Sequence, residues 1–275
     1  MIQIKDISFS YGETPVLKNI TMSLEQGRIY GLLGENGVGK TTLLTLLCGL
    51  KKVKSGSIEI DGRNPWKREP SLLGLQYFLS DEVAPVNMKA LAYADAYGRF
   101  WPNFDLGIFK EIMEVLETEK DKKMNAMSCG QLKKTYISFA LACGCKYLYM
   151  DEPTNGLDIP SKAQFRKAVM KYTPEDSTIL ISTHQVRDLE NIIDPIIILD
   201  RQDVLLNASV SEITSKLYFD YSNVLSPDAL YSEMIPGGAI QVKVNSTGED
   251  SKVNIEALFN AVHKHKELVK GIFNK

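Results

Sequence analysis

Two kinds of hydrophobic spacing alternate over most of the chain. Apolar residues at alternate positions, as in Ile2 to Phe9, indicate a strand, and so does a short apolar run before a glycine, as in Arg28 to Leu33. Leucines at helical spacing indicate a helix over residues 41–50. The predicted strands are residues 2–9, 16–24, 28–33, 57–60, 72–79, 147–150, 178–181 and 196–199, and the later helices are 161–171 and 186–193. Strands that alternate with helices favour an α/β fold with a parallel sheet.

Two stretches depart from this alternation. Three helical segments, at 88–100, 108–117 and 131–142, follow one another without a strand, which predicts a helical insertion at about residues 85–142. Beyond residue 215 the expected elements are a short helix capped by residues 226–228, a strand at 240–244 and an amphipathic helix at 255–269. We therefore expect a main domain at 1–215 and a small α+β extension at 216–275.

Composition and charge exclude several classes of protein. The 275 residues include 32 Lys and Arg against 34 Asp and Glu, so the net charge is −2. This balance disfavours binding to nucleic acid or anionic lipid through bulk charge. No apolar run approaches the roughly 20 residues that a membrane-spanning helix needs. The first residues are not followed by an apolar segment, and no signal peptide is expected.

Cysteine and histidine spacing argues against a metal site of the zinc type. Cys143-Gly144-Cys145 supplies two ligands, whereas a structural zinc site takes four. The three histidines supply no second pair at a familiar spacing. Because a chain of this length does not need a disulfide framework, we expect all four cysteines to be free thiols in a reducing compartment.

A phosphate-binding motif follows the predicted strand at 28–33. It reads Gly34-Glu35-Asn36-Gly37-Val38-Gly39-Lys40-Thr41-Thr42, which fits G-x-x-x-x-G-K-[ST] without a mismatch. Glycines let the backbone curl so that its N–H groups converge on phosphate oxygens at a helix N-terminus. Lys40 is expected to reach the β and γ phosphates of ATP, and the Thr41 hydroxyl to ligate Mg²⁺.

Two carboxylates end the apolar strand at 147–150. In a parallel sheet the carboxyl ends of the strands face the ligand crevice. Asp151 is expected to hold Mg²⁺ through water, and Glu152 to polarise a water molecule aimed at the γ phosphate. Alone, such a pair is more often an ordinary solvated strand end; the phosphate-binding motif favours the functional interpretation.

Together these motifs resemble the nucleotide-binding subunit of ATP-binding-cassette (ABC) transporters over about residues 1–215. The resemblance assigns Tyr11 to stacking on adenine, Asp158 to the loop that crosses a dimer, and His184 to the switch histidine of catalysis. Ser128-Cys129-Gly130-Gln131 is similar to the family signature, usually Leu-Ser-Gly-Gly-Gln, which completes the ATP site of the opposite protomer. The 23 residues from Ser128 to Asp151 leave room for one helix and one strand.

The resemblance implies an α/β P-loop cassette with a parallel core sheet, an N-terminal antiparallel β subdomain, a helical insertion and a small α+β extension. It also implies ATP hydrolysis with Mg²⁺, driving a separate transmembrane permease of export type. The chain is then expected at the cytoplasmic face of the membrane, in an ATP-dependent dimer with itself or a homologous cassette, without nucleic acid.

Two positions depart from the family pattern. Cys129 replaces the first glycine of the signature. For the family's glutamine loop, Gln76 is the glutamine near the right strand and is a weak candidate metal ligand. The apolar pattern of that strand instead places Ser80 or Asp81 at the loop.

Three other functions are less consistent with the sequence. Cassette ATPases of DNA repair and chromosome organisation carry long coiled coils between the two nucleotide motifs, and the 111 residues from Lys40 to Asp151 are too few for one. Translation-associated cassette proteins carry two cassettes, and one is present here. A nucleotide-gated regulatory module without catalysis is disfavoured because Glu152 and His184 are both present.

Overall fold

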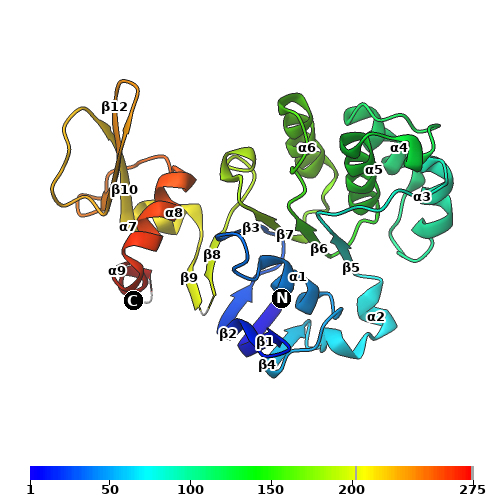
Figure 1. Cartoon of the computed structure of the whole chain (residues 1–275), viewed down its shortest axis with the longest axis horizontal. Helices are drawn as coiled ribbons and strands as arrows, with labels where there is room; N and C mark the ends of the chain where they lie inside the picture. The colour runs from blue at the N-terminus through cyan, green and yellow to red at the C-terminus, as the bar shows by residue number, and fades with distance from the viewer. Residues whose placement is uncertain (202, 274–275) are drawn as a thin grey trace.

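A six-stranded sheet forms the centre of the protein (Figure 1). The computed structural model describes residues 1–201 and 203–273. The strand order is β5-β6-β7-β3-β8-β9. The strands are β3 (Ile29–Leu33), β5 (Gln76–Leu79), β6 (Tyr147–Asp151), β7 (Thr178–Thr183), β8 (Ile196–Asp200) and β9 (Asp203–Ala208). The first five in the sheet pair in parallel, and β9 runs antiparallel to β8. Every residue of β6 and β7 is buried, as is typical of a parallel sheet covered on both faces.

A smaller antiparallel sheet packs on the core through helix α1 (Lys40–Leu47). Its strands are β2 (Thr14–Leu24), β1 (Ile2–Tyr11) and β4 (Ser55–Ile60), in the order β2-β1-β4. Three isoleucines of β1, at positions 2, 4 and 7, and the leucines of α1 share one apolar cluster with Tyr147 and Tyr149 of β6. This packing fixes the start of α1 against the carboxyl ends of the parallel strands.

The predicted insertion is helical. It contains α3 (Ala90–Gly98), α4 (Leu106–Val115) and α5 (Cys129–Ala142), with the 3-10 turn Met124–Ala126 before α5. Phe139 of α5 lies at its centre, within about 6 Å of the rings of Tyr93, Trp101 and Phe104. Helix α4 packs on α5 and on α6 (Ile159–Tyr172), which joins the insertion to the core sheet (Figure 1).

The C-terminal elements form a sheet of their own with two helices. The chain leaves β9 through α7 (Val210–Lys216) and forms β10 (Leu217–Ser222), β11 (Tyr231–Ile235) and β12 (Gly238–Val244), in the order β10-β12-β11. Helix α8 (Ile255–Lys264) packs on β11 and β12, and α9 (Lys266–Phe273) packs on β9. No helix in the described ranges is both long and apolar enough to cross a bilayer.

Four of the predicted elements are wrong in detail. The strand expected at 72–79 begins only at Gln76, because Pro70 starts a short helix, α2 (Pro70–Leu73), before it. The helix expected at 186–193 is a single 3-10 turn at Val186–Asp188. Residues 226–228 form a turn in which the Ser226 hydroxyl donates to the Asp228 carboxylate. The helix expected at 255–269 breaks at His265 into α8 and α9.

Candidate functional site

The phosphate-binding motif forms a loop between β3 and α1 that requires glycine. Gly37 and Gly39 have φ values of 78° and 109°, which side chains rarely adopt. A Cβ atom on Gly39 would lie 2.7 Å from a methyl carbon of Leu17, and one on Gly34 would lie 2.7 Å from the carbonyl oxygen of Leu199. The loop therefore curls tightly at the N-terminus of α1, where backbone N–H groups and the helix dipole favour an anion.

Lys40 places a buried cation inside this loop. Its side chain Nζ donates to the carbonyl oxygens of Gly34 at 2.7 Å and Glu35 at 3.2 Å. Burial lowers the pKa of Lys40, and the carboxylates of Glu152 and Asp151 oppose this effect. Because the carbonyl partners are neutral, the positive charge of Lys40 remains to attract an anion in the loop.

Asp151 is held by hydroxyl groups from two other elements. The Thr41 hydroxyl of α1 donates to its Oδ2 at 2.6 Å, and the Ser182 hydroxyl of β7 donates to its Oδ1. The described residues contain no group of three or more His, Cys, Asp or Glu side chains able to hold a metal ion. Mg²⁺ nevertheless often has only one or two protein ligands, such as a carboxylate and a hydroxyl, because phosphate oxygens and water supply the others. The donor set at Asp151 fits that metal.

Glu152 has an unusual backbone conformation and a well-anchored side chain. Its φ is 44°, in the left-handed region, and its N–H donates to the carbonyl oxygen of Ser182 at 3.1 Å. Its Oε1 lies 2.9 Å from Nδ1 of His184, and its Oε2 accepts from the backbone N–H of His184 at 3.3 Å. The side chain of Glu152 is 12% exposed, so its carboxylate reaches the surface while its orientation is fixed.

One pocket of about 330 Å³ brings these groups together. Among the residues that line it are Tyr11, Lys40, Thr41, Asp81, Asp151 and Glu152. A second cleft, of about 560 Å³, lies beside the loop and is closed on one side by Glu256 and Phe259 of α8. The phosphate-binding loop, Asp151 and Glu152 thus meet in one pocket at the carboxyl ends of the parallel strands, while His184 lines the second cleft.

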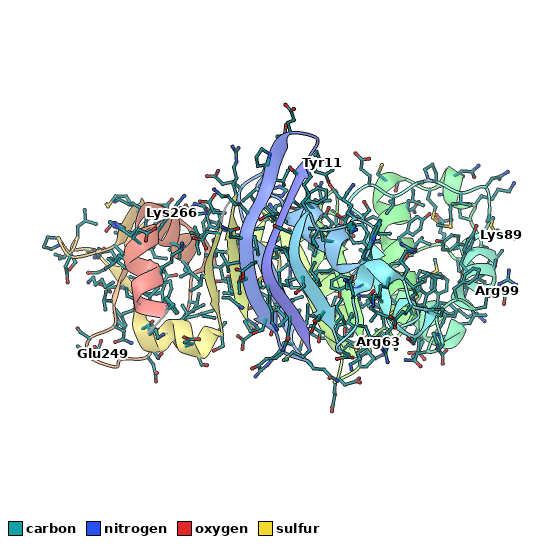
Figure 2. The ribbon with its side chains drawn as sticks, turned by 90° about the horizontal axis from the view of Figure 1, so that it is seen from below. Tyr11, Arg63, Lys89, Arg99, Glu249 and Lys266 are labelled. Atoms are coloured by element: carbon teal, nitrogen blue, oxygen red, sulfur yellow. The ribbon has the colours of Figure 1, made fainter. Side chains whose placement is uncertain are left out.

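Tyr11 lies at the end of β1 and is 48% exposed (Figure 2). Its ring packs edge-on against Phe9, with centroids 5.0 Å apart, and its hydroxyl lies 3.4 Å from Oγ1 of Thr42. The ammonium of Lys51 lies 4.9 Å from the ring centroid. An exposed ring at the rim of the pocket can stack on a planar ligand.

The signature-like residues lie outside this pocket. Ser128 is the N-cap of α5, where its hydroxyl accepts from the N–H of Gln131 and the Gln131 side chain accepts from the N–H of Ser128, both at 3.3 Å. This capping box is what the spacing of Ser128 and Gln131 favours. Cys129 beside it is exposed.

The loop that follows Glu152 lies next to the start of α5. A Cβ atom on Gly130 would lie 3.6 Å from the carbonyl oxygen of Gly156. Asp158, at the end of this loop, caps α6 by accepting from the N–H of Ser161 at 2.9 Å. Hydrogen bonds from Ser161 hold the pKa of the Asp158 carboxyl below its usual value.

Gln76 is not placed to ligate a metal, and this corrects the weak expectation from the sequence. Its side chain is buried, and Nε2 donates to the carbonyl oxygen of Leu47 and the hydroxyl of Tyr149, each at 3.2 Å. Gln76 opens β5, whereas the pocket lies beyond the other end of the strand, where Asp81 in the loop after Leu79 lines it.

Sequence reasoning gave no individual role to three residues around the site: Ser182, Lys133 and Asn155. Ser182 was visible only as part of Ser182-Thr183-His184, and its bond to Asp151 depends on the pairing of β6 with β7. Lys133 and Asn155 contact Asp81 from segments far away in the chain. No local pattern signals those contacts.

Comparison with known proteins agrees with this geometry. The ABC transporter family profile matches residues 17–155. A putative ABC transporter ATP-binding protein of Treponema denticola is 31% identical over 71% of this chain, which spans 40% of the Treponema protein. The lantibiotic transport ATP-binding protein SrtF of Streptococcus pyogenes is 30% identical over 70% of this chain and 84% of its own length. A solved dimeric bacterial ABC transporter cassette superposes with a TM-score of 0.67 at 22% identity, covering 76% of this chain and 98% of the cassette.

Proposed function

The chain belongs to the ABC transporter family of ATP-hydrolysing cassettes, and we propose that it is the subunit that converts MgATP hydrolysis into work on a separate transmembrane permease. The observation that carries this proposal is the convergence of Lys40, Thr41, Asp151 and Glu152 on one pocket. A cation inside a glycine loop, a hydroxyl–carboxylate pair and an anchored carboxylate are the parts that phosphoryl transfer to water requires.

Each part of the pocket has a proposed role. The loop N–H groups and Lys40 bind the β and γ phosphates of ATP, and Tyr11 stacks on the adenine. Thr41 and Asp151 would hold Mg²⁺, which neutralises phosphate charge when bound. Ser182 supports this role because its hydrogen bond orients the Asp151 carboxylate.

Glu152 is proposed as the general base and His184 as the residue that orients it. A water molecule in line with the γ phosphate loses its proton to the Glu152 carboxylate as its oxygen bonds to the γ phosphorus, while the bond from that phosphorus to the β–γ bridging oxygen breaks and ADP leaves. An ionised carboxylate oxygen can only accept a hydrogen bond. The 2.9 Å contact with Glu152 therefore places a proton on Nδ1 of His184. The imidazole of His184 holds Oε1 of Glu152 and the backbone N–H of His184 holds Oε2, so His184 fixes the direction of the carboxylate.

The exposed position of Ser128 and Cys129, outside the pocket of their own chain, supports action in trans. We propose that ATP joins two cassettes, either two copies of this chain or this chain and a homologue. The Ser128 hydroxyl and the N–H of Gly130 would then face the γ phosphate of the partner, with Asp158 in the loop between the protomers. The dimeric cassette of the same fold supports this arrangement.

The permease is proposed to be of export type, with the cassette at the cytoplasmic face of the membrane. The relatives include both a lantibiotic transport protein and, at 28% identity, a petrobactin import protein, so the direction is decided by the vesicle test below. The test is co-expression with a membrane protein that co-purifies with this chain, followed by reconstitution of the pair in vesicles. ATP-dependent substrate accumulation inside inverted vesicles is expected; accumulation only in right-side-out vesicles would contradict export. Loss of hydrolysis in the Glu152→Gln variant tests the ATPase itself.

A further inference from the structure

Asp81 joins three separate segments at the rim of the nucleotide pocket. It follows β5 and lines the pocket together with Thr41 and Asp151. Its carboxylate accepts from Lys133 of α5 at 2.8 Å and from Asn155 in the loop after β6 at 3.3 and 3.2 Å. We call these three residues the Asp81 bridge.

Lys133 depends on Asp81 for its charge balance. Its side chain is only 5% exposed, and its Nζ contacts both the carboxylate and, at 2.6 Å, the carbonyl oxygen of Asp81. A buried ammonium is strongly unfavourable without a paired carboxylate. The start of α5 is therefore bound to the loop after β5 by charge as well as by packing.

Lys133 also lies close to the signature-like residues. Cys129 and Lys133 are four positions apart on α5, which places them on the same face, one turn from each other. A second bond, from the Tyr136 hydroxyl to the carbonyl oxygen of Ala84 at 2.8 Å, ties the next turn to the same loop. The direction in which α5 presents Ser128 and Gly130 is thus set at the rim of the pocket.

Asn155 connects the bridge to the proposed base. Its backbone N–H donates to the carbonyl oxygen of Glu152 at 3.1 Å, closing a tight turn, while its side chain reaches Asp81. The turn that carries Glu152 and the helix that carries Ser128 therefore share one carboxylate. Strand β5 pairs with β6, as Figure 1 shows, and α5 packs on β5.

We propose that Asp81 is a positioning residue. It fixes the start of α5 relative to the turn after Glu152, so that two cassettes can close on ATP. The proposal rests on the proposed function, because it presumes an ATP-dependent dimer. Asp81 would act through Lys133 and Asn155. Loss of the bridge should raise the dissociation constant of the dimer. The affinity of the single chain for the nucleotide should change much less.

The experiment measures dimerisation and nucleotide affinity separately. Both are followed in the Glu152→Gln background, which holds ATP, with the added changes Asp81→Asn, Lys133→Met and the two together. Dimer dissociation constants come from sedimentation with MgATP. Affinity for a fluorescent ATP analogue is measured below the concentration at which chains associate. Glu82→Gln neutralises the next carboxylate along the chain and is the matched control.

Each single change is expected to raise the dimer dissociation constant about tenfold, a coupling typical of residues in direct contact. The double change should be no worse than the single ones, because the same bridge is lost. The nucleotide affinity of the Lys133→Met variant, whose residue does not line the pocket, should stay within about twofold of the parent, and so should the affinity and the dimer constant of the Glu82→Gln control. A melting temperature that falls without any change in dimerisation would mean a purely structural pair and would overturn the proposal.

Two further outcomes would overturn it. Multiplied effects, about a hundredfold in the double variant, would mean that Asp81 and Lys133 act independently. Equal losses in nucleotide affinity and in dimerisation would mean that Asp81 acts on the nucleotide directly. If the other variants do not fold, Asn155→Ala replaces them, because it leaves no buried charge unpaired. It should raise the dissociation constant of the dimer several-fold. A parent that binds no MgATP would instead refute the proposed function itself.

Discussion

His184 engages both oxygens of the Glu152 carboxylate, through its ring Nδ1 at 2.9 Å and its backbone N–H at 3.3 Å. The two residues come from neighbouring strands, Glu152 from the end of β6 and His184 from the end of β7. The orientation of the proposed base is therefore set by the strand beside it, and a shift of residues 183–185 would redirect the carboxylate.

Glu152→Gln is expected to bind ATP and to hydrolyse it orders of magnitude more slowly. The amide keeps the size of the side chain but lacks the carboxylate that polarises water. The ATP-bound dimer should accumulate, which sedimentation with MgATP will detect. Full turnover by this variant would show that Glu152 is not the base, and His184 would be the next candidate.

Lys40→Ala removes the cation inside the phosphate loop. ATP affinity and turnover should both collapse, because the β and γ phosphates lose their only charged partner in that loop. Calorimetry with MgATP measures the binding. Lys52→Ala, an exposed lysine just beyond α1, is the control and should bind normally. Wild-type affinity in the Lys40 variant would refute the assignment of the loop.

Tyr11→Ala should weaken ATP binding by about 1–2 kcal/mol, the usual loss when an aromatic ring no longer stacks on a base. Tyr11→Phe should have little effect, because the face of the ring does the stacking. Titration of a fluorescent ATP analogue compares the two. Equal losses would point to the contact between the Tyr11 hydroxyl and Thr42 and would rule out stacking.

Cys129 is expected to be covered in the ATP-bound dimer. Cys48, Cys143 and Cys145 are buried and would first be replaced by Ala, so that one thiol reports. Maleimide labelling of Cys129 in the Glu152→Gln background should slow markedly with MgATP, since burial removes access to the thiol. Equal labelling with and without MgATP, with the dimer verified by sedimentation, would mean that the signature-like residues lie outside the dimer interface.

Gln76→Met tests the correction at β5. It removes the bonds to Leu47 and Tyr149 and should cost about 1–3 kcal/mol in the free energy of unfolding. The Mg²⁺ concentration that supports half-maximal ATPase activity should not change. Denaturant unfolding and a Mg²⁺ titration are the measurements. A raised Mg²⁺ requirement would restore Gln76 as a metal ligand.

The sequence was sufficient for the parts of the site that are local. The phosphate loop lies within nine consecutive residues, Gly34 to Thr42, between a strand and a helix that their own periodicity predicts. The parallel strands of the core were visible because they are buried along their whole length, as in β6 and β7.

What could not be predicted depends on contacts between distant segments. The Asp81 bridge joins residues 52 and 74 positions apart, so no spacing rule applies to it. Strands β10 and β11 were not predicted. They are partly exposed, and their polar and apolar residues do not alternate clearly enough to indicate a strand. The apolar pattern ended the strand correctly at Leu79 and placed Ser80 or Asp81 in the loop after it; the helix from Pro70, which puts Gln76 at the opposite end of β5, was not predicted.

The backbone at Glu152 carries a consequence for the evolution and engineering of this chain. A φ of 44° at a residue with a side chain costs about 1–3 kcal/mol, and glycine would adopt it without that penalty. Glycine there would relieve the strain and delete the carboxylate in one step. With Glu152 as the proposed base, selection for thermal stability alone would favour glycine and a loss of turnover at this position, and only selection for turnover would retain the strained glutamate.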